Sequence, residues 1–165
     1  MYEGGKMKIY SDDPNLPYKT TKLNWKYTKT EIDAELAKWG VKDSMWHMDL
    51  EHNTVFVEFK FAEVIDGINV SPVVHVDAPA IWNHTMRNKT EEINWNISFR
   101  IMYWFIHTHL AAAYVTQSSK TVAFLPYIKA GEEGEQLSKI VLRNLEKIQS
   151  MPALEAPAHG KVIIE

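Results

Sequence analysis

The chain of 165 residues contains no cysteine. This excludes disulfides, thiol nucleophiles and thiolate metal sites, and it fits a reducing compartment. The N-terminal residues lack the apolar core of a secretory signal, and the most apolar stretch, residues 101–115, is shorter than the roughly 20 residues that cross a bilayer. We therefore expect a cytoplasmic protein without a membrane partner.

Three signatures of common enzymes are also missing: the glycine-rich phosphate loop, the dinucleotide-binding fingerprint and the serine-hydrolase turn. The formal net charge of −3 excludes a global field that would draw the protein onto nucleic acid. The charge is uneven, however. Residues 1–30 carry six lysines and three acidic residues, whereas residues 31–70 carry three basic and nine acidic residues.

The lysines of the N-terminal segment alternate with tyrosine and tryptophan. Such a pattern is typical of surfaces that bind a single nucleic-acid strand, and a solvated irregular segment is the alternative interpretation. Two further cations stand at the start of the second predicted helix, beside acidic residues. The candidate nucleic-acid-binding residues are Lys19, Lys22, Lys26, Lys29, Arg87 and Lys89.

Three helices are predicted from capping motifs and apolar periodicity. A capping box that begins at Thr28 predicts a helix to about Trp39, and Gly40 ends it. The spacing of apolar residues predicts a long buried helix over 88–115 and an amphipathic helix after Gly134.

Three strands are predicted between the first two helices, joined by turns at His52-Asn53 and Asp66-Gly67. The fold class is therefore α+β. We expect a two-layer domain over residues 1–150, in which a three-stranded antiparallel meander packs on helices in the order (β)αβββαα, with or without the N-terminal strand. Residues 151–165 are expected to form an extended tail.

The polar face of this meander holds the candidate chemistry. Two-residue turns would pair His47 with Glu58 and Glu58 with His75, an arrangement that suits zinc or another transition metal. Alternatively, Asp49 with Glu58-x-Lys60 resembles the D…ExK signature of a large nuclease fold, which implies Mg²⁺ held by the two carboxylates. Met48 occupies the place of the proline that this signature expects. A solvated face with alternating charges is the third interpretation.

Most of the chain carries a second resemblance. The stretches LNWKYTKTEIDAELAKWGV, RIMYWFIHTHLAAA and AFLPYI…GEEGEQLSKIVLRNLE resemble a group of uncharacterised small α+β proteins of phages and prophage-like elements. The resemblance implies a mobile-element context and no particular activity. We therefore expect a non-catalytic interaction module without a cofactor, which binds nucleic acid or a protein of replication or defence. The alternative is a divalent-metal nuclease that uses Asp49, Glu58 and Lys60.

The C-terminal residues have strand character. Pro152 and Pro157 prevent a helix from continuing, and Val162-Ile163-Ile164 favours a strand. We expect this segment to add to a sheet edge in its own domain or in a neighbouring copy, which in the second case makes a homo-oligomer.

Overall fold

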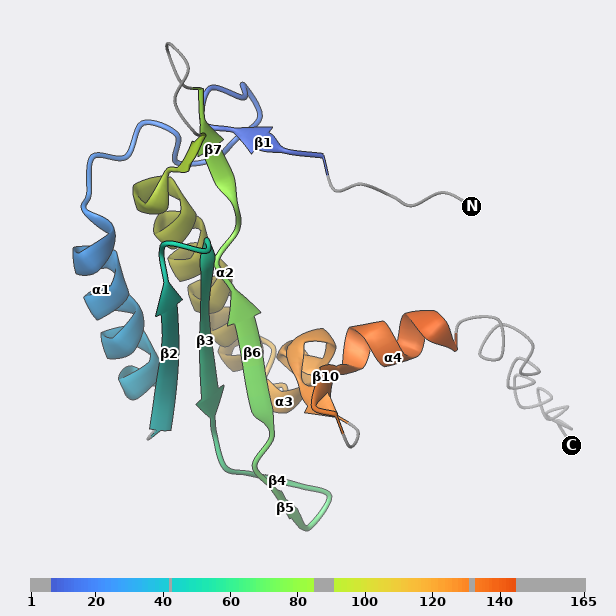
Figure 1. Ribbon diagram of the computed structural model, residues 1–165. Helices are drawn as coiled ribbons and strands as arrows, with labels where there is room; N and C mark the ends of the chain where they lie inside the picture. Colours follow the sequence, from blue (N-terminus) through green and yellow to red (C-terminus); the bar gives the residue numbers. More distant parts are fainter. Residues whose placement is uncertain (1–6, 42, 85–90, 131–132, 145–165) are drawn as a thin grey trace, which may run out of the picture.

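The computed structural model confirms the α+β class and describes residues 7–41, 43–84, 91–130 and 133–144. Two helices lie on one face of an antiparallel three-stranded sheet (Figure 1). The sheet order is β2-β3-β6, and the elements of these two layers are α1 (Trp25–Lys38), β2 (Asp43–Asp49), β3 (Thr54–Lys60), β6 (Val73–Asp77) and α2 (Trp95–Val115).

Short elements surround these layers. The expected N-terminal strand is present, but it pairs in parallel with β7 of a second small sheet instead of joining the meander. That sheet consists of β1 (Ile9–Tyr10), β7 (Ile81–Asn83) and β8 (Glu92–Ile93). The other elements are β4 (Glu63–Ile65), β5 (Ile68–Val70), α3 (Lys120–Ala123), the 3₁₀ helix η1 (Leu125–Tyr127), β9 (Lys129–Ala130), β10 (Glu135–Gln136) and α4 (Leu137–Arg143).

The core lies between the sheet and the two long helices. Alternate residues of β3 and β6 are buried, as the period of two requires for a sheet with one covered face. The side of α2 that meets them is apolar. The buried residues of these three elements are Val55, Val57, Phe59, Val74, Val76, Ile97, Ser98, Phe99, Met102, Ile106, Leu110 and Ala113.

The register of the sheet agrees with the prediction in one hairpin and differs in the other. Glu58 lies opposite His75, as expected from the Asp66-Gly67 turn. His47 lies opposite Phe56 instead of Glu58, because a four-residue loop, residues 50–53, joins β2 to β3. The prediction of a two-residue turn there was therefore wrong. The shift of two residues keeps every side chain on its predicted face, since strand side chains alternate.

Both long helices begin at an asparagine that the sequence interpretation did not select. α1 starts after Asn24, whose Oδ1 accepts from the Lys26 N–H, so the predicted cap residue Thr28 lies inside the helix and is buried. α2 starts after Asn94, because residues 92–93 belong to β8. The predicted end of α1 is confirmed, since Gly40 follows it with φ +85°.

Within the described residues, no helix combines the length and apolar character needed to cross a membrane. α4 begins near the predicted position and is described as far as Arg143. The predictions for the C-terminal tail, 151–165, and for its strand lie outside the described residues.

Candidate functional site

The sheet has a second face, opposite the helices, over which none of the described helices lies (Figure 1). We call it the open sheet face. It carries the outward residues of three strands, namely Asp43, Met45, His47, Asp49, Thr54, Phe56, Glu58, Lys60, Val73, His75 and Asp77.

A chain of charged groups crosses this face. Glu58 Oε1 accepts from Lys129 Nζ at 2.8 Å and lies 2.9 Å from His75 Nδ1, while His75 Nε2 lies 3.0 Å from Asp77 Oδ1. The imidazole of His75 thus lies between two carboxylates, those of Glu58 and Asp77. Burial opposes ionisation of Glu58, but the hydrogen bonds from Lys129 and His75 outweigh it, and the pKa of Glu58 lies below its ordinary value.

The predicted metal set is not assembled at one point. Glu58 and His75 meet, but the ring of His47 stacks on Phe56 at 4.8 Å, and Phe56 in turn contacts the ring of His75 at 4.4 Å. Within the described part of the chain, no three His, Asp or Glu side chains lie close enough to hold a metal ion together. The face instead carries a row of three rings in contact, in which His47 stacks on Phe56 and His75 is tilted against Phe56.

The predicted nuclease set is also separated. Asp49 lies opposite Thr54, four residues along β3 from Glu58, which corresponds to roughly 13 Å of strand. The Asp49 carboxylate accepts from the backbone N–H of His52 and contacts its ring, so it closes the loop after β2. The residue opposite Lys60 is Asp43. The geometry therefore does not support a site made of Asp49, Glu58 and Lys60.

The predicted lysines lie on a different side of the molecule. Lys19 and Lys22 are exposed in the loop before α1, and Lys26 is exposed in its first turn. Lys29 pairs with Asp33 at 3.2 Å and lies over the Trp46 ring. The other two candidates, Arg87 and Lys89, are outside the described residues.

Aromatic side chains accompany these lysines. Tyr18 is 42% exposed and stacks on Trp104 of α2, with ring centroids 5.9 Å apart and an interplanar angle of 12°. Tyr27 is 57% exposed. The guanidinium of Arg100 lies 5.6 Å from the Trp104 ring centroid, which adds a cation to the same place. We call this set, Tyr18, Lys19, Lys22, Lys26, Tyr27, Lys29, Arg100 and Trp104, the basic aromatic surface.

Polar pairs between α1 and α2 hold this surface in place. Arg100 donates to Glu31 at 2.6 Å, and one turn further Glu35 Oε1 accepts from Trp39 Nε1 and contacts His107 Nδ1. Burial of Glu35 acts against ionisation, but these two hydrogen bonds outweigh it, so its pKa is lowered. The helix that carries Trp104 is thereby fixed against the helix that carries the lysines.

Sequence reasoning did not identify Arg100, Trp104 or Lys129 as site residues. Arg100 and Trp104 are four residues apart on a helix that is apolar nearly all round. The apolar pattern therefore did not indicate which side of this helix faces solvent. Lys129 reaches Glu58 from 71 residues further along the chain, and no local pattern signals such a contact.

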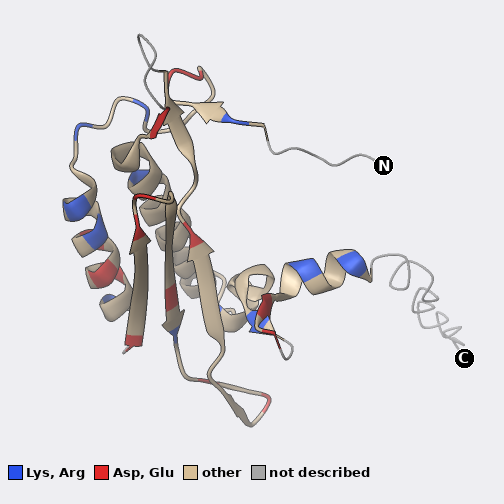
Figure 2. Cartoon of the chain, in the orientation of Figure 1, with Lys and Arg blue, Asp and Glu red and all other residues tan. Residues whose placement is uncertain are grey.

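Charge separates the two candidate surfaces. Figure 2 shows basic residues along the loop before α1 and the first turns of that helix, whereas acidic residues mark both ends of β2 and the end of β6. A polyanion is therefore attracted to the basic aromatic surface and repelled from the rims of the open sheet face.

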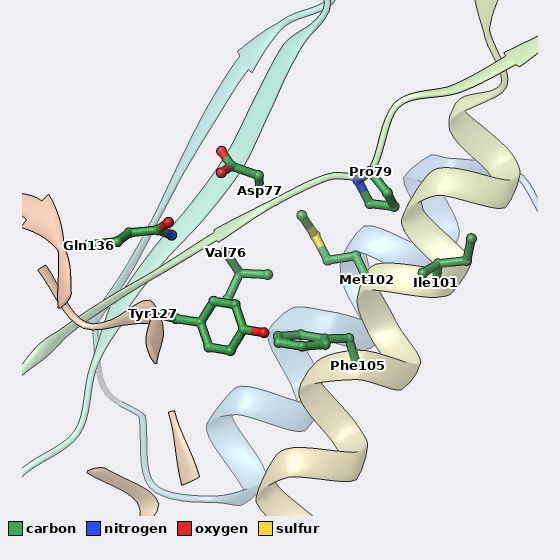
Figure 3. Close-up of a pocket in the computed structure, with 8 residues that line it drawn as sticks. All are labelled: Val76, Asp77, Pro79, Ile101, Met102, Phe105, Tyr127 and Gln136. Atoms are coloured by element: carbon green, nitrogen blue, oxygen red, sulfur yellow. The ribbon is translucent and has the colours of Figure 1, made fainter. Parts of the chain in front are cut away.

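A small apolar pocket lies between β6 and α2 (Figure 3). Its volume is about 230 Å³, below the roughly 300 Å³ at which pockets for drug-sized ligands begin. The lining residues are Val76, Asp77, Pro79, Ile101, Met102, Phe105, Tyr127 and Gln136. The acidic or basic residue in this lining is Asp77, which is exposed at the end of β6.

Comparisons were made with protein-family models, curated proteins and solved structures, and none of them matches this chain.

Proposed function

We propose that this chain is a non-catalytic interaction module that binds single-stranded nucleic acid through the basic aromatic surface. The observation that carries the proposal is the exposed Tyr18–Trp104 stack with Lys19 and Lys22 beside it. A viral or mobile-element context rests on the sequence resemblance alone.

The charge of the surface suits a phosphate backbone. Lys19, Lys22 and Lys26 are exposed, and the described residues show no ion pair for any of them. Lysines in this state release counterions when phosphates bind, which gives affinity that depends on salt but not on sequence.

The rings suit unpaired bases. Tyr18 and Tyr27 are 42% and 57% exposed, and a base that stacks on an exposed aromatic ring gains about 1–3 kcal/mol. Bases in a duplex are already stacked on each other and cannot use these rings. We therefore expect single strands to bind more tightly than duplexes of the same length.

Fluorescence anisotropy with a labelled oligo(dT) strand of about 20 nucleotides and a matching duplex tests the proposal. At 50 mM NaCl the strand should bind, and the slope of log K against log salt should be about −2, since each phosphate contact on a single strand contributes about −0.7. The variant Lys19→Gln/Lys22→Gln/Lys26→Gln should lose most of this slope.

A matched variant controls for the loss of positive charge itself. Lys38→Gln/Lys60→Gln/Lys139→Gln removes three exposed lysines from other parts of the molecule and should bind nearly as the parent does. Tyr18→Ala should weaken binding about fivefold or more, and Tyr18→Phe should not. No binding tighter than about 10 µM at low salt, or equal losses in the two lysine variants, would contradict the proposal and leave a protein partner.

A further inference from the structure

The two edges of the three-stranded sheet differ. The β6 edge is covered, because Ile128 forms a bridge to Val74 and Gln136 Nε2 donates to the His75 carbonyl at 3.0 Å. The opposite edge belongs to β2, and within the described residues no strand pairs with it. One edge is thus closed by the chain itself, and the other has no partner strand among the residues that the structure describes.

The open edge has few of the features that prevent strand addition. β2 is seven residues long, contains no proline and pairs with β3 without a bulge. Its charged residues are confined to the ends, Asp43 and Asp49, and Met45 between them is 56% exposed. Long edges of this kind offer free backbone N–H and C=O groups to another extended segment.

We propose that β2 receives residues 161–165 of a second copy of this chain as a parallel strand. These residues, Lys-Val-Ile-Ile-Glu, lie outside the described residues. The charge and apolar pattern of their sequence complements that of β2. In the proposed register, Lys161 meets Asp43, Ile163 meets the exposed Met45, and Glu165 meets His47. All three contacts fall on the open sheet face, since both sets are spaced by two.

Charge selects this direction. In an antiparallel pairing that keeps Ile163 against Met45, Glu165 lies beside Asp43, and like charges opposite each other destabilise a strand pair. In the proposed parallel pairing, the aliphatic residues Val162 and Ile164 face the helix side of the sheet, near Ser44 and Trp46. The segment between Arg143 and Lys161 spans up to roughly 55 Å when extended, which is enough to reach a neighbouring molecule.

Exchange between two copies closes the assembly. If each copy donates its segment to the β2 edge of the other, both edges are covered and a twofold dimer results. Its test is separate from that of the proposed nucleic-acid function, because Asp43, Lys161 and Ile163 do not belong to the basic aromatic surface.

Light scattering after size-exclusion chromatography tests the inference on the full chain. We expect a mass twice that of the 19.1 kDa chain. Ile163→Pro should give the single-chain mass, because proline blocks strand pairing, whereas Ile163→Val should remain dimeric. Asp43→Lys and Lys161→Asp should each raise the dimer dissociation constant about fivefold or more, and the double variant should restore it.

Three results would overturn the inference. The first is a parent protein that elutes with the mass of one chain. If Ile163→Pro also lowers the melting temperature of that monomer, the segment pairs with a sheet of its own chain. The second is a dimer that survives Ile163→Pro. The third is additive losses in the two charge variants without recovery in the double variant. Circular dichroism of Asp43→Lys establishes that the fold is kept, and Lys161→Asp provides the same test without altering the sheet.

Discussion

At the scale of single residues, Thr28 presents a buried hydroxyl in the first half of α1. Its side chain is fully buried, and among the described residues its Oγ1 is the buried side-chain polar atom that lacks a hydrogen-bond partner. A buried polar group in this state costs about 1–3 kcal/mol. The hydroxyl that the capping-box motif assigned to the helix start therefore acts against stability where it lies.

Thr28→Val should raise the free energy of unfolding by about 1 kcal/mol, because it removes the unpaired hydroxyl and keeps the shape of the side chain. Thr28→Ser, which keeps the hydroxyl and removes a methyl group, should lower it by about 1 kcal/mol. Urea denaturation of both variants measures the two changes. Equal losses in both would show that the hydroxyl has a partner in solution.

Glu58 predicts a pH dependence of stability. Its side chain is only 14% exposed, and its folded pKa is depressed below the ordinary value of 4.5. A depressed pKa contributes stability that is present above the unfolded pKa and is lost as the pH falls through the folded pKa. Acidification below about pH 4.5 should therefore lower the free energy of unfolding, because the contribution of ionised Glu58 is lost.

Glu58→Gln should cost about 1–2 kcal/mol at pH 7, because the charge-assisted bonds with Lys129 and His75 are lost. As the pH falls from 7 to 3 the parent carboxyl moves toward its neutral form, so the gap between the two proteins should narrow. Urea denaturation at both pH values measures the difference. A gap that persists unchanged at pH 3 would indicate that packing, and not charge, makes Glu58 important.

Glu58 and its neighbours show how much of the site can be predicted from the sequence. The pairing with His75 followed from the Asp66-Gly67 turn, whose residues adopt the positive φ values that such hairpins need. The position of His47 did not follow, because residues 50–53 form a longer loop closed by Asp49. The loop is closed by a hydrogen bond between the Asp49 side chain and the His52 backbone. Several loop lengths allow such a bond, so the sequence does not determine the length of this loop.

At the scale of elements, Glu63 joins the β4–β5 hairpin to α3. Its carboxylate accepts from the hydroxyls of Ser119 and Thr121 and from the backbone N–H groups of Lys120 and Thr121. Burial opposes its ionisation, but these bonds outweigh it, and the pKa of Glu63 is lowered. A helix of four residues is thereby held by a side chain from another element.

Glu63→Ala should lower the free energy of unfolding by about 2 kcal/mol, because the first N–H groups of α3 lose their acceptor. The exposed Glu51→Ala is the control, and it should change stability by less than about 0.5 kcal/mol. Urea denaturation gives both values, and amide exchange at Lys120 and Thr121 should accelerate only in Glu63→Ala. Unchanged exchange there would refute the role of Glu63 as a cap.

Helix ends show why some elements were predictable only in part. Apolar periodicity predicted that α1 and α2 exist, and Gly40 correctly marked the end of α1. Their starts were misplaced because Asn24, Thr28 and Asn94 all have side chains suited to capping. The choice among them was made by tertiary contacts, such as the Trp25 N–H that donates to Asn96 at 2.9 Å.

At the scale of the whole molecule, basic residues gather along the loop before α1 and the start of that helix, and acidic residues lie at the ends of β2 and β6 (Figure 2). The acidic residues of the open sheet face should oppose the approach of a polyanion to the protein even though they do not contact it. The effect depends on screening, since the Debye length is about 30 Å at 0.01 M salt and about 8 Å at 0.15 M.

Asp77→Asn should therefore strengthen the binding of oligo(dT) about twofold at 10 mM salt and leave it unchanged at 150 mM. Anisotropy titrations at the two salt concentrations measure this. The exposed Glu133→Gln, just before β10, gives a second acidic position for comparison. A gain of the same size at high salt would mean that the open sheet face itself contacts the strand.

The hairpin of β4 and β5 continues the ladder between β3 and β6 without a change of register. Lys60 lies opposite Val73, Glu63 lies opposite Val70, and two residues on each strand separate these pairs. Because the arms are matched in length, the tip at Asp66-Gly67 can be opened without shifting the sheet. The chain should accept a Gly/Ser linker of about 20 residues, or a genetically encoded reporter, between these two residues, with a melting temperature within a few degrees of the parent.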